Sequence, residues 1–131
     1  MQTIEVATGS REELVDVTRQ VDEAVRATGV IEGWALVYCP HTTAAVTVNE
    51  SADPDVPRDI LAALADLCPR SRGWRHAEGN ADAHAKAVLV GPSVTLPVQG
   101  GSLVLGTWQG VFFCEFDGPR RRRLTVIVVG S

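Results

Sequence analysis

The chain has 131 residues and a formal net charge of −4, which comes from 16 acidic and 12 basic side chains. A chain of this length is typical of one domain with a substantial core, so we expect a single domain over residues 1–131. The acidic balance argues against a nucleic-acid partner, because affinity for phosphate backbones is built from clustered cationic charge.

The N-terminal segment predicts a strand followed by a helix. Apolar and polar residues alternate over 2–7, which is typical of a short strand. Ser10 and Glu13 then have the form of a capping box, and apolar residues recur at helical spacing as far as Gly29. We therefore expect a surface helix that starts near Ser10.

Two runs rich in β-branched and aromatic residues occupy 33–39 and 43–49. Pro40 and His41 separate them. This pattern predicts two antiparallel strands around a short turn, with His41 at the end of a strand.

Helix signals return in the middle of the chain. Asp53 before Pro54 suits the N-cap and the first position of a helix, and apolar residues follow at spacings of three and four. Asn80 is expected to cap a shorter helix that runs to about Val90, where the Gly-Pro pair at 91–92 ends it.

The rest of the chain has the pattern of strands separated by turns. The expected strands are 94–98, 102–105, 111–115 and 121–129. A majority of short antiparallel strands with two or three helices indicates an α+β fold. Residues 126–129 are apolar on both faces, which fits a strand covered twice, by helices and in one interpretation also by another subunit.

Cysteine usage and segment hydropathy indicate the compartment. Cys39, Cys68 and Cys114 are an odd number without a CxxC pair, and each has apolar neighbours, which favours buried reduced thiols. The N-terminus lacks a basic segment followed by an apolar stretch, and no run of about 18 apolar residues occurs. We expect a cytoplasmic protein with no membrane partner.

The three histidines are His41, His76 and His84. Zinc binds neutral imidazoles, and the positive end of a helix beginning near Asn80 would lower the proton affinity of His84. The alternative, of equal weight, is that His76 and His84 are ordinary loop and surface residues. For His41, the pattern slightly favours a hydrogen-bonded turn residue.

Several other polar residues stand where site groups are often found. Asn49 and Glu50 end a strand, Glu115 follows two phenylalanines and a cysteine, and Gln109 closes a Gly-Thr-Trp-Gln turn. Glu50 or Glu115 could serve as a general base, and Gln109 offers a donor and an acceptor. Each also has a structural interpretation: a turn residue, or a carboxylate on an exposed strand face.

The arginine run from Arg120 to Arg123 enters a strand, so its side chains should alternate between the two faces. Two of the four could bind a phosphate bidentately. A solvated edge or a subunit contact paired with acids is the equally weighted alternative.

The order of these motifs along the chain is a further observation. The motifs are His-Thr-Thr-Ala at 41–44, Asn49-Glu50, Asp53-Pro54-Asp55, His76, Asn80, Ala83-His84, Leu105 to Gln109 and Glu115 to Arg120. Together they resemble the YjbQ family of small proteins over nearly the whole chain. The resemblance implies an α+β homotrimer, described as a secondary thiamine-phosphate synthase because some members show weak activity of that kind.

The resemblance also implies one shared polar cleft. We assign His41, His76 and His84 as metal ligands, Asn49, Asn80 and Gln109 as substrate-binding residues, and Glu50, Glu115 and Arg120 as catalytic residues.

The implied reaction joins a hydroxymethylpyrimidine diphosphate to a thiazole phosphate and expels diphosphate, so the partner is a small phosphorylated ligand. A divalent ion and an arginine would neutralise the developing charge. Magnesium prefers oxygen ligands, whereas histidines favour zinc or manganese. Two alternatives stay open: a metal-dependent hydrolase or lyase of unknown substrate, and a non-catalytic trimer that binds a metal or an anion.

Overall fold

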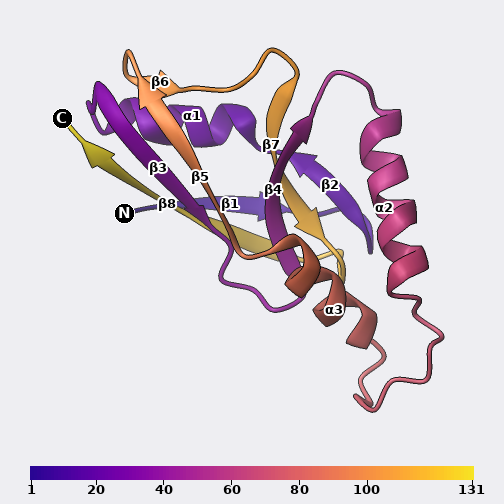
Figure 1. The fold of residues 1–131 in the computed structure, drawn as a ribbon. Coiled ribbons are helices and arrows are strands. Elements are labelled where there is room, and N and C mark those ends of the chain that lie inside the picture. The colour runs from indigo at the N-terminus through magenta and orange to yellow at the C-terminus, as the bar shows by residue number, and fades with distance from the viewer.

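The eight strands of the computed structural model, which describes residues 1–131, divide between two antiparallel sheets (Figure 1). The larger sheet has the order β1 (Gln2–Ala7), β8 (Arg121–Gly130), β3 (Glu32–Tyr38), β5 (Ser93–Gln99) and β6 (Ser102–Leu103). The smaller sheet has the order β2 (Glu13–Asp16), β7 (Gln109–Glu115) and β4 (Ala44–Glu50). With three helices, this architecture confirms the α+β class.

The expected hairpin between β3 and β4 is wrong, although both strands exist. β3 pairs along its length with β5 and β8, whereas β4 pairs with β7 in the other sheet. The segment around Pro40 and His41 therefore crosses from one sheet to the other. Alternating apolar residues specify that a segment is a strand and which face is buried, but they leave the choice of partner to the rest of the chain.

The expected helix start at Ser10 is also wrong. Residues 13–16 form β2, and α1 (Thr18–Ala27) begins only afterwards. Leu14 packs against one core cluster and Val15 against the other, which is the two-sided arrangement of a strand. The Glu13 carboxylate does accept a backbone hydrogen bond, but from the Gly9 N–H, so it closes a bend instead of capping a helix.

The main core lies between α1 and the inner faces of both sheets. It contains 16 buried residues, including Val17, Val21 and Val25 from the predicted apolar stripe, and Val126 and Phe113 from the two sheets. The predicted stripe is therefore confirmed from Val17 onward. Burial of such side chains is the main stabilising contribution to the fold.

Two helices cover the opposite face of the smaller sheet (Figure 1). They are α2 (Asp55–Leu67) and α3 (Ala81–Val90), which begin and end within a few residues of the prediction. A second cluster of five buried residues joins them to the sheet, with Phe116 as its largest member. None of the helices is long and apolar enough to cross a membrane.

The three cysteines are buried and unpaired, as the sequence predicted. Burial raises the pKa of the Cys114 thiol to about 12, so this thiol stays protonated and unreactive at neutral pH.

The larger sheet has an outer face that turns away from the main core. We use this name for the apolar side chains of Trp34, Leu36, Tyr38, Pro97, Ile127 and Val129. Trp34 and Tyr38 are each 43% exposed and Val129 is 45% exposed. The expected covering of residues 126–129 on both faces is therefore not provided within one chain, because Val126 is buried while Val129 faces outward.

Candidate functional site

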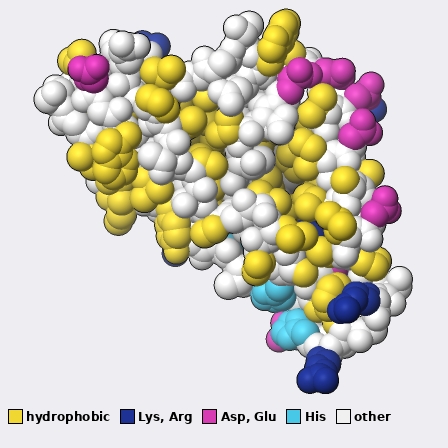
Figure 2. All heavy atoms as spheres, in the orientation of Figure 1, with side chains coloured by type: hydrophobic (Ala, Val, Ile, Leu, Met, Phe, Trp, Pro, Cys, Tyr) yellow, Lys and Arg dark blue, Asp and Glu magenta, His cyan; other side chains and the backbone are white.

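Two of the three histidines meet beside α3. His76 lies in the loop before the helix and His84 lies in the helix, and their ring centroids are 5.2 Å apart with the rings at 85°. The His76 Nε2 atom also lies 3.8 Å from a carboxylate oxygen of Glu78. Figure 2 shows histidine side chains at this end of the molecule, with basic side chains close by.

His41 reaches the same region from the crossover between β3 and β4. Its Nε2 atom accepts a hydrogen bond of 3.0 Å from the Arg123 backbone N–H, and its ring stands edge-on to Phe113. Burial and the charge of Arg122 lower the pKa of His41 below its ordinary value. A neutral ring is therefore the stable form at neutral pH, which leaves Nε2 free to accept.

His41 and His84 line one recess of about 330 Å³, which we call the histidine recess. Its other lining residues are Thr42, Ala44, Ala87, Val88 and Pro92. The recess is therefore mainly apolar, with two imidazoles on its wall. No group of three or more His, Cys, Asp or Glu side chains lies together in metal-binding geometry in a single chain.

Burial of His41 and the nearby charge of Arg122, which lower its pKa, predict a pH effect on stability. Because the folded-state pKa of His41 lies below the unfolded value of about 6.5, its neutral form contributes stability above that pH, and this is lost as the pH falls further. We expect the free energy of unfolding, measured with urea, to fall less between pH 7.5 and pH 5.5 in His41→Gln than in the wild type. The glutamine amide oxygen can still accept the hydrogen bond but does not become protonated in this range. Equal losses in the two proteins would contradict this assignment.

Asn80 links α3 to the loop between β7 and β8. It occupies the N-cap position of α3, as predicted, but its side chain makes no cap hydrogen bond. Instead its Nδ2 donates to Asp117 Oδ2 at 2.9 Å, and an Arg120 guanidinium nitrogen donates to the same oxygen at 2.8 Å. The Asn80 Oδ1 atom is buried and has no partner. The link fixes the start of α3, and hence His84, relative to Arg120.

Glu115 lies in a buried ion pair. Its side chain is fully buried, and its Oε1 accepts hydrogen bonds from Thr8 Oγ1 at 2.8 Å and Arg122 Nε at 2.9 Å. Its Oε2 accepts from Arg122 and from the Asp117 backbone N–H. No carboxylate oxygen is left to face a ligand, so in this structure Glu115 acts as a structural anchor.

The remaining candidates lie at the other end of the smaller sheet. Asn49 pairs in register with Gly110, and Glu50 with Gln109, whereas His41 precedes the first residue of β4. At about 3.4 Å per residue, the strand separates these groups from His41 by roughly 20 Å. One chain therefore does not bring all nine predicted site residues into one cleft.

The Gly-Thr-Trp-Gln turn is closed by its own side chain. Gly106 N–H donates to Gln109 Oε1 at 2.8 Å, and Gln109 N–H donates to the Gly106 carbonyl at 3.0 Å. The turn connects the two sheets and leaves Trp108 63% exposed. Gln109 thus has a structural role within one chain, and Trp108 projects from the turn into solvent.

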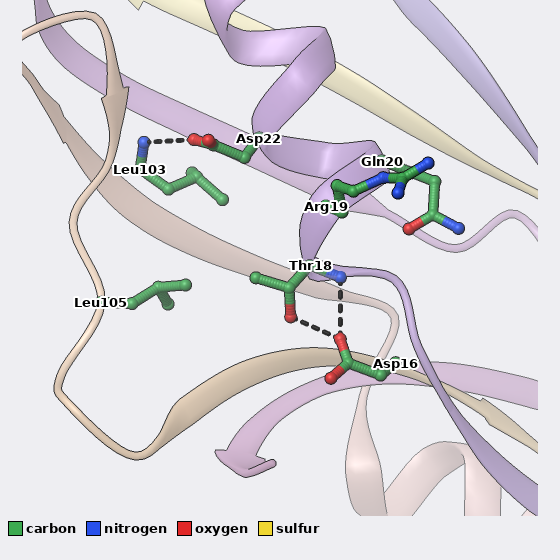
Figure 3. A pocket seen from close by; sticks show the side chains of 7 residues that line it. All are labelled: Asp16, Thr18, Arg19, Gln20, Asp22, Leu103 and Leu105. Atoms are coloured by element: carbon green, nitrogen blue, oxygen red, sulfur yellow. Dashed lines mark hydrogen bonds between the residues drawn. The ribbon is translucent and has the colours of Figure 1, made fainter. Parts of the chain in front are cut away.

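The largest recess, of about 420 Å³, lies beside the start of α1 (Figure 3). Its polar groups bond one another: Asp16 accepts from the backbone N–H and hydroxyl of Thr18, and Asp22 accepts from the Leu103 N–H. It contains none of the predicted site residues, and its carboxylates already have partners.

Sequence reasoning missed a buried network on α3. Lys86 is 2% exposed and donates to Asp82 at 3.0 Å and to Glu12, while Arg11 donates to both oxygens of Asp82. The spacing of Asp82 and Lys86, four residues apart on one helix face, was the available signal.

Comparison with known proteins decides the family. A family model described as UPF0047 protein YjbQ-like matches residues 2–131. The chain belongs to the YjbQ family. Among YjbQ relatives, UPF0047 protein YugU of Bacillus subtilis is 47% identical over 131 residues and covers 99% of each chain. UPF0047 protein MJ1081 of Methanocaldococcus jannaschii is 49% identical, over 97% of this chain and 92% of its own.

Solved YjbQ structures have the same fold. A YjbQ/UPF0047 family protein from Clostridium acetobutylicum superposes with a TM-score of 0.96 at 46% identity, over 98% of this chain and 100% of its own. The conserved hypothetical protein TT1486 of Thermus thermophilus superposes with a TM-score of 0.92 at 43% identity, with the same coverage. The YjbQ prediction made from the motifs is thus confirmed.

The YjbQ motif glycine at Gly118 has a steric explanation in this chain. A Cβ atom there would lie 2.5 Å from the Ser10 carbonyl oxygen, 2.8 Å from Glu115 Cγ and 2.9 Å from Thr8 Oγ1. The Asp-Gly-Pro-Arg segment therefore owes its glycine to the packing around the buried carboxylate of Glu115.

Proposed function

We propose that this protein is a metal-assisted enzyme that acts on small phosphorylated molecules at the histidine recess, with weak thiamine-phosphate synthase activity as its candidate reaction. The observation that carries the proposal is the edge-on packing of His76 and His84, whose ring centroids are 5.2 Å apart, next to a recess that His84 shares with His41. The choice of reaction comes from the family resemblance.

His76 and His84 are the residues that would hold a divalent cation, with Glu78 as a nearby carboxylate. Two imidazoles and one carboxylate suit zinc or manganese better than magnesium. When bound, such an ion would stabilise the negative charge of a leaving diphosphate.

The walls of the recess suit an aromatic ring that carries a phosphorylated substituent. Ala87, Val88 and Pro92 offer apolar contact. Arg120 does not line the recess, but Asn80 and Asp117 link it to the start of α3. It is tied to Asp117 through Nε and one terminal nitrogen, which leaves the other terminal nitrogen for a phosphate oxygen. In the reaction, the bond between the methylene carbon and the diphosphate oxygen breaks, its electron pair leaves with diphosphate, and the thiazole nitrogen forms the new C–N bond.

In a trimer, the two groups of predicted site residues that are far apart in one chain could meet between neighbouring copies. The exposed apolar outer face is a surface of the kind that oligomers bury. Asn49, Glu50 and Gln109 of one copy could then lie beside the histidine recess of its neighbour. The homotrimer itself comes from the resemblance, and mass measurement in solution tests it.

The proposal predicts that His84→Ala loses activity while it keeps its fold. We expect product formation from the two phosphorylated precursors to fall by at least about 100-fold, the scale of losing one electrostatic stabiliser of a transition state. Bound zinc or manganese, measured by elemental analysis, should fall in parallel. Circular dichroism checks the fold, and Gln20→Ala, on the exposed surface of α1, is a control that should change neither measurement.

Other results would point to other functions. Turnover of simple phosphate esters without a thiazole acceptor would indicate a hydrolase, with Glu50 as a candidate base for a water molecule. Tight metal or anion binding without any turnover would indicate a non-catalytic trimer. If the purified protein holds no metal and removal of all three histidines leaves activity unchanged, the metal site is refuted.

A further inference from the structure

A second, smaller recess lies where β8 begins, next to His41. Its volume is about 180 Å³, and its lining residues are Glu5, His41, Arg121, Arg122 and Arg123. No apolar side chain lines it. Since one water molecule occupies about 30 Å³ in the liquid, the space is large enough for a phosphate group with some of its hydration.

Two of the lining arginines carry uncompensated charge. Arg121 and Arg123 are exposed and lie two residues apart on one face of β8, so their side chains point the same way. Neither guanidinium lies within 4.0 Å of a carboxylate, although seven guanidinium–carboxylate pairs occur elsewhere in the chain. By contrast, Arg120 and Arg122 are both paired.

The opposing carboxylate is Glu5, the register partner of Arg123 on β1. It lines the recess but forms no ion pair there. Two like charges side by side repel each other, and a dianion placed between them would remove that repulsion. The recess is therefore suited to an anion, and guanidinium groups match the oxygens of a phosphate.

His41 connects this recess to the histidine recess, because its ring lines both. The bond from the Arg123 N–H to His41 Nε2 holds the ring in place between them. A single ligand could therefore place a phosphate among the arginines and an apolar ring against Ala87 and Val88, on the other side of His41.

We propose that Arg121, Arg123 and His41 form a phosphate-binding subsite for a small phosphate monoester whose apolar ring occupies the histidine recess. The subsite deepens the proposed function and rests on it for the placement of the reacting end of the ligand. The phosphate contact itself does not depend on a metal, so the two can be tested separately.

Phenyl phosphate and inorganic phosphate are the probes, with binding measured by isothermal titration calorimetry. The wild type should bind phenyl phosphate more tightly than inorganic phosphate, since only the former fills the apolar side. The variant Arg121→Gln/Arg123→Gln should bind both at least ten-fold more weakly. Arg58→Gln/Arg70→Gln removes the same charge from exposed positions elsewhere and should stay within two-fold of the wild type.

Two further variants sharpen the result. Glu5→Gln removes the opposing charge and should strengthen phosphate binding. His84→Ala should keep inorganic phosphate binding while it loses metal and activity, so a failure of the proposed function would leave the subsite standing. Circular dichroism confirms that each variant is folded.

The proposal is overturned by any of three results. The wild type could fail to bind either probe at millimolar concentration, the double variant could retain wild-type affinity, or the control pair could lose as much affinity as the Arg121/Arg123 pair. The last result would assign binding to the overall charge of the protein and not to this recess.

Discussion

Replacing Arg122 with methionine is expected to lower the free energy of unfolding by about 3–5 kcal/mol, the usual cost of removing one partner from a buried ion pair. Arg122 and Glu115 have side chains that are 5% and 0% exposed. The variant would leave the Glu115 carboxylate buried with only Thr8 and the Asp117 N–H as donors. Urea unfolding at pH 7 measures the loss.

A matched control lies two residues away. Arg120 pairs with Asp117, but its side chain is 53% exposed, so Arg120→Met should cost less than about 1 kcal/mol. The double variant Glu115→Leu/Arg122→Met should recover much of the loss, because no charge then remains buried. A loss in Arg122→Met no larger than in the control would refute the anchoring role of the pair.

Lowering the pH should remove the stability contributed by the ion pair of Glu115 and Arg122. Burial alone would raise the pKa of Glu115, but hydrogen bonds from Arg122 and Thr8 hold it below its ordinary value. A depressed carboxyl pKa contributes stability above the unfolded-state value of about 4.3, and this contribution is lost as the pH falls through the folded-state pKa. The Arg122→Met variant should therefore lose less stability than the wild type between pH 5 and pH 3.

Replacing Asp82 with alanine is the second large expected effect, again about 3–5 kcal/mol. The Asp82 side chain is 1% exposed and pairs with Lys86, which is 2% exposed, and with Arg11. Its loss would leave the Lys86 ammonium buried with Glu12 alone. It would also remove the carboxylate from the first turn of α3, where the helix dipole favours negative charge.

Asp55→Ala is the control, because Asp55 also lies in the first turn of a helix but forms an exposed pair with Arg58. We expect a cost below about 1 kcal/mol there. Urea unfolding of both variants at pH 7 gives the comparison. Equal costs would show that the network on α3 contributes no more than a surface ion pair.

The Asp82 network also bears on the candidate site. Asp82 and Lys86 are buried and pair with side chains of the segment before β2, and His84 lies two residues from each, about 200° around the helix from them. The buried charges thus turn His84 toward the recess. An Asp82→Ala variant that stays folded should bind metal more weakly than Asp55→Ala, since the helix that carries His84 is less firmly held.

Sequence patterns predicted the elements better than their partners. The alternation over 2–7 and the Asn80 and Gly91 signals gave β1 and α3 nearly to the residue, because these signals are local. The strand at 13–16 was missed because Ser10 and Glu13 satisfy a local capping rule, whereas β2 exists through its pairing with β7, about a hundred residues away. The partner of β4 was missed for the same reason.

In the candidate site, too, local contacts were predicted from the sequence and long-range contacts were not. Proximity of His76 and His84 followed from a loop and a helix that are adjacent in sequence, and the contact is present. The roles of Glu115 and Arg122 depend on contacts with Thr8 and Thr43, which no spacing in the sequence reveals. Strand alternation did predict that Arg122 would face opposite to Arg121 and Arg123, and burial of Arg122 alone confirms it.

The alternation of these arginine side chains between two faces fixes the pairing register of β8. β8 lies between β1 and β3, and its inner face meets one buried carboxylate, Glu115 of β7, which a single arginine neutralises. A slip by one residue would turn Arg121 and Arg123 inward and Leu124 outward, which would bury two cations against one acid and expose the core. Because only one buried carboxylate faces these three consecutive arginines, β8 can pair with its neighbouring strands in only one register.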